Sequence, residues 1–155
     1  RNYKVIMELT VYLSGEIHTQ WRDEIIDKCI NLNLPIEFLS PITNHELSDD
    51  VGIKILGRED KKFWHDYKSA KINSLRTKNA IERADIVVVR FGEKYKQWNA
   101  AFDAGYAIGL SKSLIVFHNN EYQHALKEID ASASAVAKTV NEVVKILQYT
   151  STNKI

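Results

Sequence analysis

The sequence predicts an α/β fold: a three-layer, flavodoxin-like, doubly wound parallel sheet of about five strands, with helices on both faces. Two observations lead to this prediction. Short β-rich runs alternate with helical patterns along the chain, which is typical of consecutive βαβ units. The run Ala84–Val89 is almost continuously apolar, as expected for a strand that is buried on both faces of a parallel sheet.

Local patterns predict the individual elements. The expected strands are β-rich runs bounded by turn residues, over 8–13, 35–39, 84–89, 113–117 and 134–137. The expected helices carry apolar residues at helical spacing, over 21–30, 51–56, 60–83, 98–108, 121–129 and 140–147. The polar stretch 40–50 is expected to be a loop, and the long helix is expected to bend near Ala70. Thr139 and Glu142 have the spacing of a capping box at the start of the last helix.

The length and composition predict a single domain over residues 7–150. A chain of 155 residues can bury a core without a disulfide or a metal, and its single cysteine, Cys29, is expected to be a small buried thiol. Residues 1–6 precede the only methionine, Met7, and are expected to be an N-terminal extension or a remnant of cloning. Because no apolar run approaches the roughly 20 residues of a membrane span, we expect a cytoplasmic protein.

The charge balance argues against two classes of partner. The sequence holds 21 basic and 20 acidic residues, a formal net charge of +1, which creates no field that would gather nucleic acid or anionic lipid.

A metal site is not expected either. His45, Asp49 and Asp50 share one polar stretch but lack a recognised metal-ligand spacing. We therefore expect no nucleic acid, no membrane, no metal and no cofactor.

The expected strand order, 2-1-3-4-5, locates a ligand site before any single residue is considered. In that order the first and third strands are neighbours, and ligands bind outside their carboxyl ends. The loops that follow these two strands should therefore form a crevice. From these loops we expect the ligand-binding residues Tyr12, Ser14, Gly15, Ile17, Gly92 and Glu93.

Asp103 is the strongest candidate for chemistry in this crevice. It lies among small residues on the helix that follows the second of these loops, so a ligand has room to approach. A half-buried carboxylate of this kind can act as a nucleophile on an anomeric carbon. The structural alternative, a hydrogen bond to a backbone amide or a neighbouring arginine, remains open.

Other side chains near the crevice could assist. Glu16 and His18 are separated by one residue, and such a pair can serve as general acid or base near neutral pH, or can be solvated surface groups. Arg22, one turn into the next helix, could reach an anion held by the turn that precedes the helix. Trp98 and Asn99 could contact a base or a sugar, or could serve packing alone.

Three segments carry a resemblance to a known family: VYLSGEIHTQWRDEI (11–25), ITNHELSDD (42–50) and ADIVVVRFGEKYKQWNAAFDAGYAIGLSKSLIV (84–116). From Met7 to about Tyr149 the chain resembles the nucleoside 2-deoxyribosyltransferase superfamily, in particular its YtoQ branch. The resemblance implies that a carboxylate attacks C1′ of a 2′-deoxynucleoside, that the base leaves, and that a second base or water then takes the sugar from the enzyme. It also implies that Asp103 occupies the nucleophile position, and that the protein is a homo-oligomer, a dimer or larger, whose neighbours complete the site.

Two positions depart from the family pattern. The characterised enzymes carry glutamate where this chain has Asp103, which withdraws the carboxylate by about one C–C bond, and a misplacement of about 1 Å can cost roughly a hundredfold in rate. They also carry an aspartate, which helps to orient and protonate the substrate, where this chain has Thr77 beside Arg76. The candidates to replace that acid are Glu16, His18 and Glu93.

The leading hypothesis is an enzyme that acts on the N-glycosidic bond of a small-molecule nucleoside or nucleotide, of the 2-deoxyribosyltransferase or hydrolase type. Asp103 would be the nucleophile, with Glu16 or His18 as proton donor to the departing base. Arg76 or Arg22 would contact a phosphate or a hydroxyl. The alternative is a binding module that holds a nucleotide-like ligand in the same crevice without chemistry, and a third possibility is a structural or assembly protein without a ligand.

Overall fold

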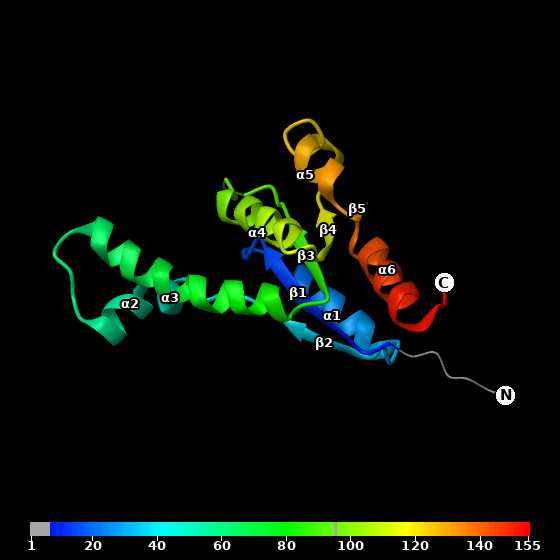
Figure 1. Ribbon diagram of the computed structural model, residues 1–155, viewed down its shortest axis with the longest axis horizontal. Helices are drawn as coiled ribbons and strands as arrows, with labels where there is room; N and C mark the ends of the chain where they lie inside the picture. The colour runs from blue at the N-terminus through cyan, green and yellow to red at the C-terminus, as the bar shows by residue number, and fades with distance from the viewer. Residues whose placement is uncertain (1–6, 95) are drawn as a thin grey trace.

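Five parallel strands form the central sheet in the order β2-β1-β3-β4-β5 (Figure 1). The computed structural model describes residues 7–94 and 96–155, so the expected N-terminal extension 1–6 lies outside the described residues. The strands are β1 (Leu9–Gly15), β2 (Ile36–Leu39), β3 (Ile86–Arg90), β4 (Ser113–Phe117) and β5 (Ala135–Ala137). The predicted α/β class and the flavodoxin-like strand order are confirmed.

Helices cover both faces of this sheet and make a three-layer architecture. One face packs against α1 (Trp21–Asn31) and α6 (Val140–Thr152). The other face packs against the end of α3 (Lys62–Arg83), against α4 (Trp98–Gly109) and against α5 (Lys127–Ser132). Along β3 the side chains alternate between the two faces: Val88 packs toward α1 and α6, and Val87 and Val89 pack toward α4. This two-sided burial explains the continuous apolar run in the sequence.

One part of the molecule stands away from the sheet. The helix α2 (His45–Leu56) and the first half of α3 pack against each other as a hairpin, which we call the arm, on the left of Figure 1. The two helices meet closely at Gly52, where a Cβ atom would lie 2.4 Å from the backbone nitrogen of Ser69. The Ser69 hydroxyl accepts a hydrogen bond from the Gly52 amide and donates one to the carbonyl of Asp49. The arm is thus fastened by its own contacts.

Two expected elements differ from the observed ones. The stretch expected to be a loop over 40–50 already becomes helical at His45, because the Asn44 side chain accepts a hydrogen bond from the Leu47 amide and caps α2. The helix expected over 121–129 is instead a single 3-10 turn at Asn120–Tyr122 followed by α5. In that turn the bonds run from residue i to i+3, as from Gln123 to Asn120, so no α-helix starts there.

Candidate active site

The carboxyl ends of β1 and β3 lie side by side, and the end of β1 lines a cavity of about 1330 Å³. The cavity is bounded by the loop after β1, by the end of β2 and the loop after it, by the arm and by the start of α4. Nine of the residues predicted for the site line it: Tyr12, Gly15, Glu16, Ile17, His18, Arg76, Trp98, Asn99 and Asp103. The other four are absent from the cavity wall: Ser14, Arg22, Gly92 and Glu93. The cavity therefore receives the loop after β1 and, from the loop after β3, only its last residues.

Gly15 lets the two strands end in contact. Its φ is +106°, and a Cβ atom at this position would lie 2.2 Å from the carbonyl oxygen of Arg90. The same carbonyl accepts a hydrogen bond from the Glu16 amide at 3.0 Å. Only glycine combines this backbone conformation with so close an approach, so the shape of the cavity floor depends on it.

Asp103 presents its carboxylate to the cavity from the second turn of α4. Its Oδ2 accepts a hydrogen bond from the Ser14 hydroxyl at 2.5 Å. Burial raises the pKa of Asp103, while the bond from Ser14 lowers it, and the net pKa lies above the usual value of 3.8. Ser14 thus lies behind the carboxylate and orients it. A half-buried, oriented carboxylate next to open space can serve as a nucleophile or as an acid and base.

Tyr12 and Thr77 form a second polar pair at the cavity. Tyr12 is 1% exposed, and burial, together with the charge of Asp103, raises the pKa of its phenol to about 12. A side-chain hydrogen bond with Thr77 lowers the pKa, but by less than burial raises it. The phenol therefore keeps its proton at neutral pH. Thr77 itself lines the cavity, although a threonine in a helix gave no sequence signal for a contact to the first strand.

Glu16 holds the loop after β1 in place. Its carboxylate accepts hydrogen bonds from the amides of His18 and Thr19 and from the Thr19 hydroxyl. Burial alone would raise the pKa of Glu16, but these bonds and the charge of Arg90, whose Nε lies 3.6 Å from Oε2, outweigh it and lower the pKa below 4.5. Such a carboxylate carries no proton near neutral pH. This geometry fits a structural role better than the proton-donor role considered from the sequence.

Arg22 does not reach the cavity. Its Nε, Nη1 and Nη2 donate to the backbone carbonyls of Leu13, Glu16 and Gly15. Burial lowers the pKa of Arg22 to about 10, and the side chain is only 5% exposed. Because its donors are directed at the loop, the contact to a phosphate that the sequence suggested has no geometric basis. The sequence could not show that this arginine would be buried.

Gly92 and Glu93 also turn away from the cavity. The Gly92 amide donates to the side chain of Gln97, and a Cβ atom at Gly92 would lie 2.6 Å from Cγ of Glu16. The Glu93 carboxylate accepts a hydrogen bond from Asn119, which follows β4. The loop after β3 therefore packs against the Glu16 network, and its contribution to the cavity comes from its last residues, Lys96 and Gln97.

His18 meets a residue that was not among the predicted site residues. Its ring stacks on the ring of His45, with 5.1 Å between the centroids and 20° between the planes. Both histidines line the cavity, one from the loop after β1 and the other from the first turn of α2. The segment ITNHELSDD, which contributed to the family resemblance, was the available signal for His45.

The side chains and helices of residues 7–94 and 96–155 bear on metal binding and on membranes. Nowhere in these ranges do three or more His, Cys, Asp or Glu side chains gather in an arrangement able to hold a metal ion. Over the same residues, none of the helices combines the length and the apolar character needed to cross a bilayer.

Comparisons with known proteins agree with the fold. A family described as nucleoside 2-deoxyribosyltransferase YtoQ matches residues 12–151 of this chain. The protein YtoQ of Bacillus subtilis (strain 168) is 46% identical over 143 residues, which cover 92% of this chain and 97% of that protein.

Three solved structures share the architecture. A conserved protein from Enterococcus faecalis V583 superposes with a TM-score of 0.61 at 10% identity, covering 93% of this chain and 99% of the other. A 2-deoxyribosyltransferase from Bacillus psychrosaccharolyticus gives a TM-score of 0.52 at 19% identity, over 87% and 90% of the two chains. The CMP N-glycosidase BcmB of Clostridium botulinum also gives 0.52, at 12% identity, over 90% and 98%. At these identities the likeness shows a common fold.

Proposed function

Because this chain belongs to the nucleoside 2-deoxyribosyltransferase YtoQ family, we propose that it is an enzyme that breaks the N-glycosidic bond of a nucleoside or nucleotide. The observation that carries the proposal is the carboxylate of Asp103, which faces the cavity and is oriented by Ser14. Two proteins of the same fold are named for reactions of this kind, a 2-deoxyribosyltransferase and a CMP N-glycosidase. We also propose that the protein works in the cytoplasm on small-molecule substrates.

In the proposed mechanism an Asp103 oxygen attacks C1′ of the sugar. The new C–O bond forms while the C–N bond to the base breaks, and the electron pair of that bond leaves with the base. His18 supplies the proton that the departing base requires. A second base, or water, then attacks C1′ and releases the carboxylate, while the proton that this nucleophile loses returns to His18, and the cycle completes either a transfer or a hydrolysis.

The short side chain of Asp103 sets a geometric condition on this mechanism. The sugar must approach α4 more closely than a glutamate would require. On this helix the cavity wall beside Asp103 is formed by Trp98, Asn99, Ala100 and Phe102, while Ala104 and Ala107 pack against the sheet. A substrate would therefore have to reach Asp103 past the aromatic rings of Trp98 and Phe102.

A binding module remains the second candidate, and one observation favours it. The family's second carboxylate is absent here, and Thr77, which stands in its place, is engaged with Tyr12. If no other group protonates the base, the cavity would hold a nucleotide-like ligand without turnover. Ligand-dependent thermal stabilisation without release of base would support this candidate.

The test of the enzymatic proposal is an assay of base release and base exchange. The protein is incubated with a panel of deoxynucleosides, ribonucleosides and their 5′-monophosphates, each with and without an acceptor base. We expect turnover of at least one compound, and we expect Asp103→Asn to abolish it. Full activity of Asp103→Asn would exclude the proposed nucleophile, and mass spectrometry of the wild type should detect the sugar–enzyme adduct.

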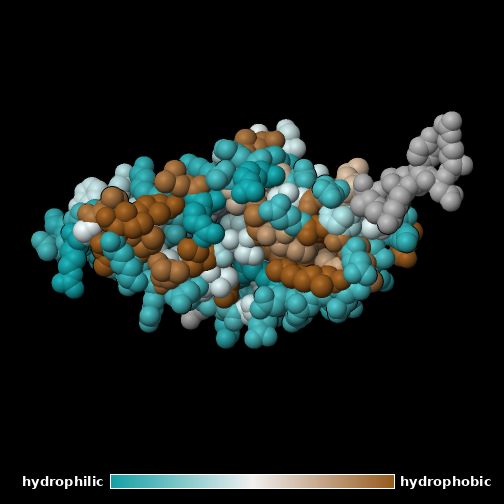
Figure 2. Space-filling model, turned by 90° about the horizontal axis from the view of Figure 1, so that it is seen from below, coloured by the Kyte–Doolittle hydropathy of each residue, from teal (hydrophilic) through white to brown (hydrophobic). Residues whose placement is uncertain are grey.

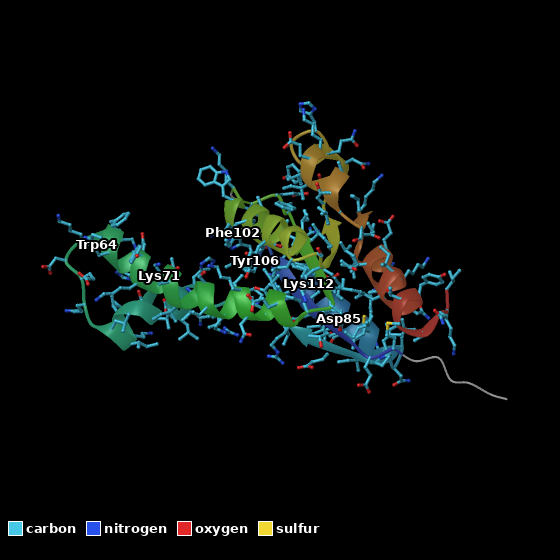
Figure 3. The ribbon with its side chains drawn as sticks, viewed as in Figure 1. Trp64, Lys71, Asp85, Phe102, Tyr106 and Lys112 are labelled. Atoms are coloured by element: carbon cyan, nitrogen blue, oxygen red, sulfur yellow. The ribbon has the colours of Figure 1, made fainter. Side chains whose placement is uncertain are left out.

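We further propose a homo-oligomer that forms through the arm. Phe63, Trp64 and Tyr67 are 65%, 46% and 45% exposed, and their rings pack against one another as an aromatic cluster on α3. Figure 3 shows Trp64 on the part of α3 that lies far from the sheet, and the arm carries a large hydrophobic patch on the face seen in Figure 2. Exposed apolar patches of this kind mark association surfaces.

A second copy of this chain is the partner that we propose for the aromatic cluster. The cluster exposes on the order of 300 Å² of apolar surface, whereas a stable interface buries roughly 800 Å² on each partner. Two further exposed apolar side chains at the end of the arm, Ile55 and Leu56, add to this surface. Because the arm is also a wall of the cavity, a copy bound there would help to shield the substrate from water.

A further inference from the structure

The proposed function leaves one feature of the cavity wall without a role, the stacked pair of His18 and His45. We infer that His45 is a positioning residue, whose ring fixes the ring of His18 so that an edge of His18 faces the departing base. This inference rests on the proposed function, in which His18 donates a proton. His45 belongs to no part of the mechanism described above.

The position of His45 is itself well fixed. Asn44 caps α2 by accepting a hydrogen bond from the Leu47 amide, which determines where the helix begins and where its first side chain points. The start of α2 is fastened to α3 by the Asn73 amide group, which donates to the carbonyl and the hydroxyl of Ser48. The ring of His45 is therefore presented from a supported helix end.

His18 lies on the loop that leads from β1 to α1, and its side chain, like that of His45, is exposed. An exposed side chain that must adopt one rotamer for reaction loses conformational freedom each time it does so. A ring stacked on the supported ring of His45 has already lost part of this freedom. Pre-orientation of this kind raises the rate because proton transfer requires the donor nitrogen within hydrogen-bond distance of the base.

The stacked geometry also decides how His45 can act. The nitrogen atoms of an imidazole donate and accept in the plane of the ring, and the two planes are only 20° from parallel at 5.1 Å. No hydrogen bond can pass between the rings in this arrangement, so His45 does not relay a proton to His18. Its effect comes from ring contact, and an aromatic ring without nitrogen should be able to replace it.

This difference gives a test with three variants. His45→Ala should lower kcat by about tenfold and leave KM within twofold. A misplacement of about 1 Å can cost roughly a hundredfold in rate, and we expect the proton donor to be displaced by less than that. His45→Phe should restore most of kcat, because it restores the stack. His124→Ala, which removes a histidine from an exposed turn far from the cavity, should change nothing. If His45→Phe is as impaired as His45→Ala, the positioning role is excluded.

A second measurement does not depend on activity. NMR relaxation of the His18 ring carbons should show a rigid ring in the wild type and in His45→Phe, and a mobile ring in His45→Ala. An equally rigid His18 ring in His45→Ala would overturn the inference. If the wild type turns over none of the nucleosides and nucleotides, the proposed function fails, and the relaxation data still decide whether His45 holds His18.

Discussion

The hydroxyl of Ser14 donates to the carboxylate of Asp103 across a sequence separation of 89 residues, with 2.5 Å between Oγ and Oδ2. This bond joins the carboxyl end of β1 to α4 across the point where the chain reverses direction in the sheet. It also opposes the effect of burial on the pKa of Asp103, because a donor favours the charged form of the carboxylate.

Ser14→Ala should therefore impair catalysis and shift its pH dependence. A hydrogen bond to a charged group contributes about 1.5–3 kcal/mol, so we expect kcat to fall by roughly ten- to a hundredfold. Loss of the bond lets burial raise the pKa of Asp103 further. Since the reaction needs the charged carboxylate, the acid limb of the pH–rate profile should move to higher pH. Ser113→Ala, at the exposed start of β4, is the control, and an unmoved acid limb in Ser14→Ala would contradict the assignment.

The raised pKa of Asp103 also predicts a cost in stability. The native state holds this proton up to a higher pH than the unfolded state does, so stability falls as the pH rises from 3.8 through the raised pKa. Asp103→Asn cannot ionise and should lose this pH dependence. We expect it to be inactive yet at least as stable as the wild type at pH 7, as measured by urea unfolding at about pH 4 and pH 7. A marked loss of stability at pH 7 would show that the charged carboxylate stabilises the fold.

Glu16→Gln should reduce stability through the loop after β1. The carboxylate accepts three hydrogen bonds and faces Arg90, so we expect a loss of about 2 kcal/mol at pH 7. Because the pKa of Glu16 is lowered, its contribution is present above 4.5 and is lost as the pH falls through the native pKa. The difference between variant and wild type should thus shrink in acid. Glu128→Gln, on the exposed face of α5, serves as control; loss of activity with unchanged stability would instead support a proton-donor role for Glu16.

Gly15→Ala should destabilise the protein by about 2–4 kcal/mol, because the added Cβ atom meets the Arg90 carbonyl at 2.2 Å in a backbone conformation that favours glycine. Gly105→Ala is the matched substitution, since a Cβ atom there meets nothing within 4 Å and the residue lies inside α4. Alanine at this helical position should stabilise by about 0.5–1 kcal/mol. Urea unfolding of both variants measures the contrast, and equal effects would refute the close contact of β1 and β3.

A charge in the aromatic cluster should dissociate the proposed homo-oligomer. Trp64→Glu would bury a carboxylate against apolar side chains of a second copy, which is unfavourable by several kcal/mol. Light scattering coupled to size-exclusion chromatography should show a lower mass than for the wild type. Tyr149→Glu replaces an aromatic residue of similar exposure, 55%, on α6 and should leave the mass unchanged. A monomeric wild type would refute the proposal.

The parts of the fold that depend on local pattern could be predicted from the sequence. The apolar run before Phe91 gave the buried strand β3, and the strand order then located the cavity and the position of Asp103 beside it. The start of α2 was missed because residues 45–50 have the polar composition of a loop, whereas in the structure Asn44 caps a helix that begins there. Residues that are able to cap a helix are common in polar stretches, so the sequence alone does not show which of them does so.

The burial and the hydrogen-bond partners of charged side chains could not be predicted in the same way. Arg22 was expected to face a ligand, yet the backbone of the loop after β1 takes up its donors. Glu16 looked like half of an acid–base pair, yet it is 3% exposed and bonded to amides. Burial of a charged group depends on how distant segments close around it, and the spacing of residues in one loop carries no information about that.

The separation between Ser14 and Asp103 has a consequence for how the protein matures. Both β1 and α4 contribute to the pocket, so the proposed ligand could bind only after these two elements have assembled. A ligand bound there should accordingly protect β1 and α4 from proteolysis together.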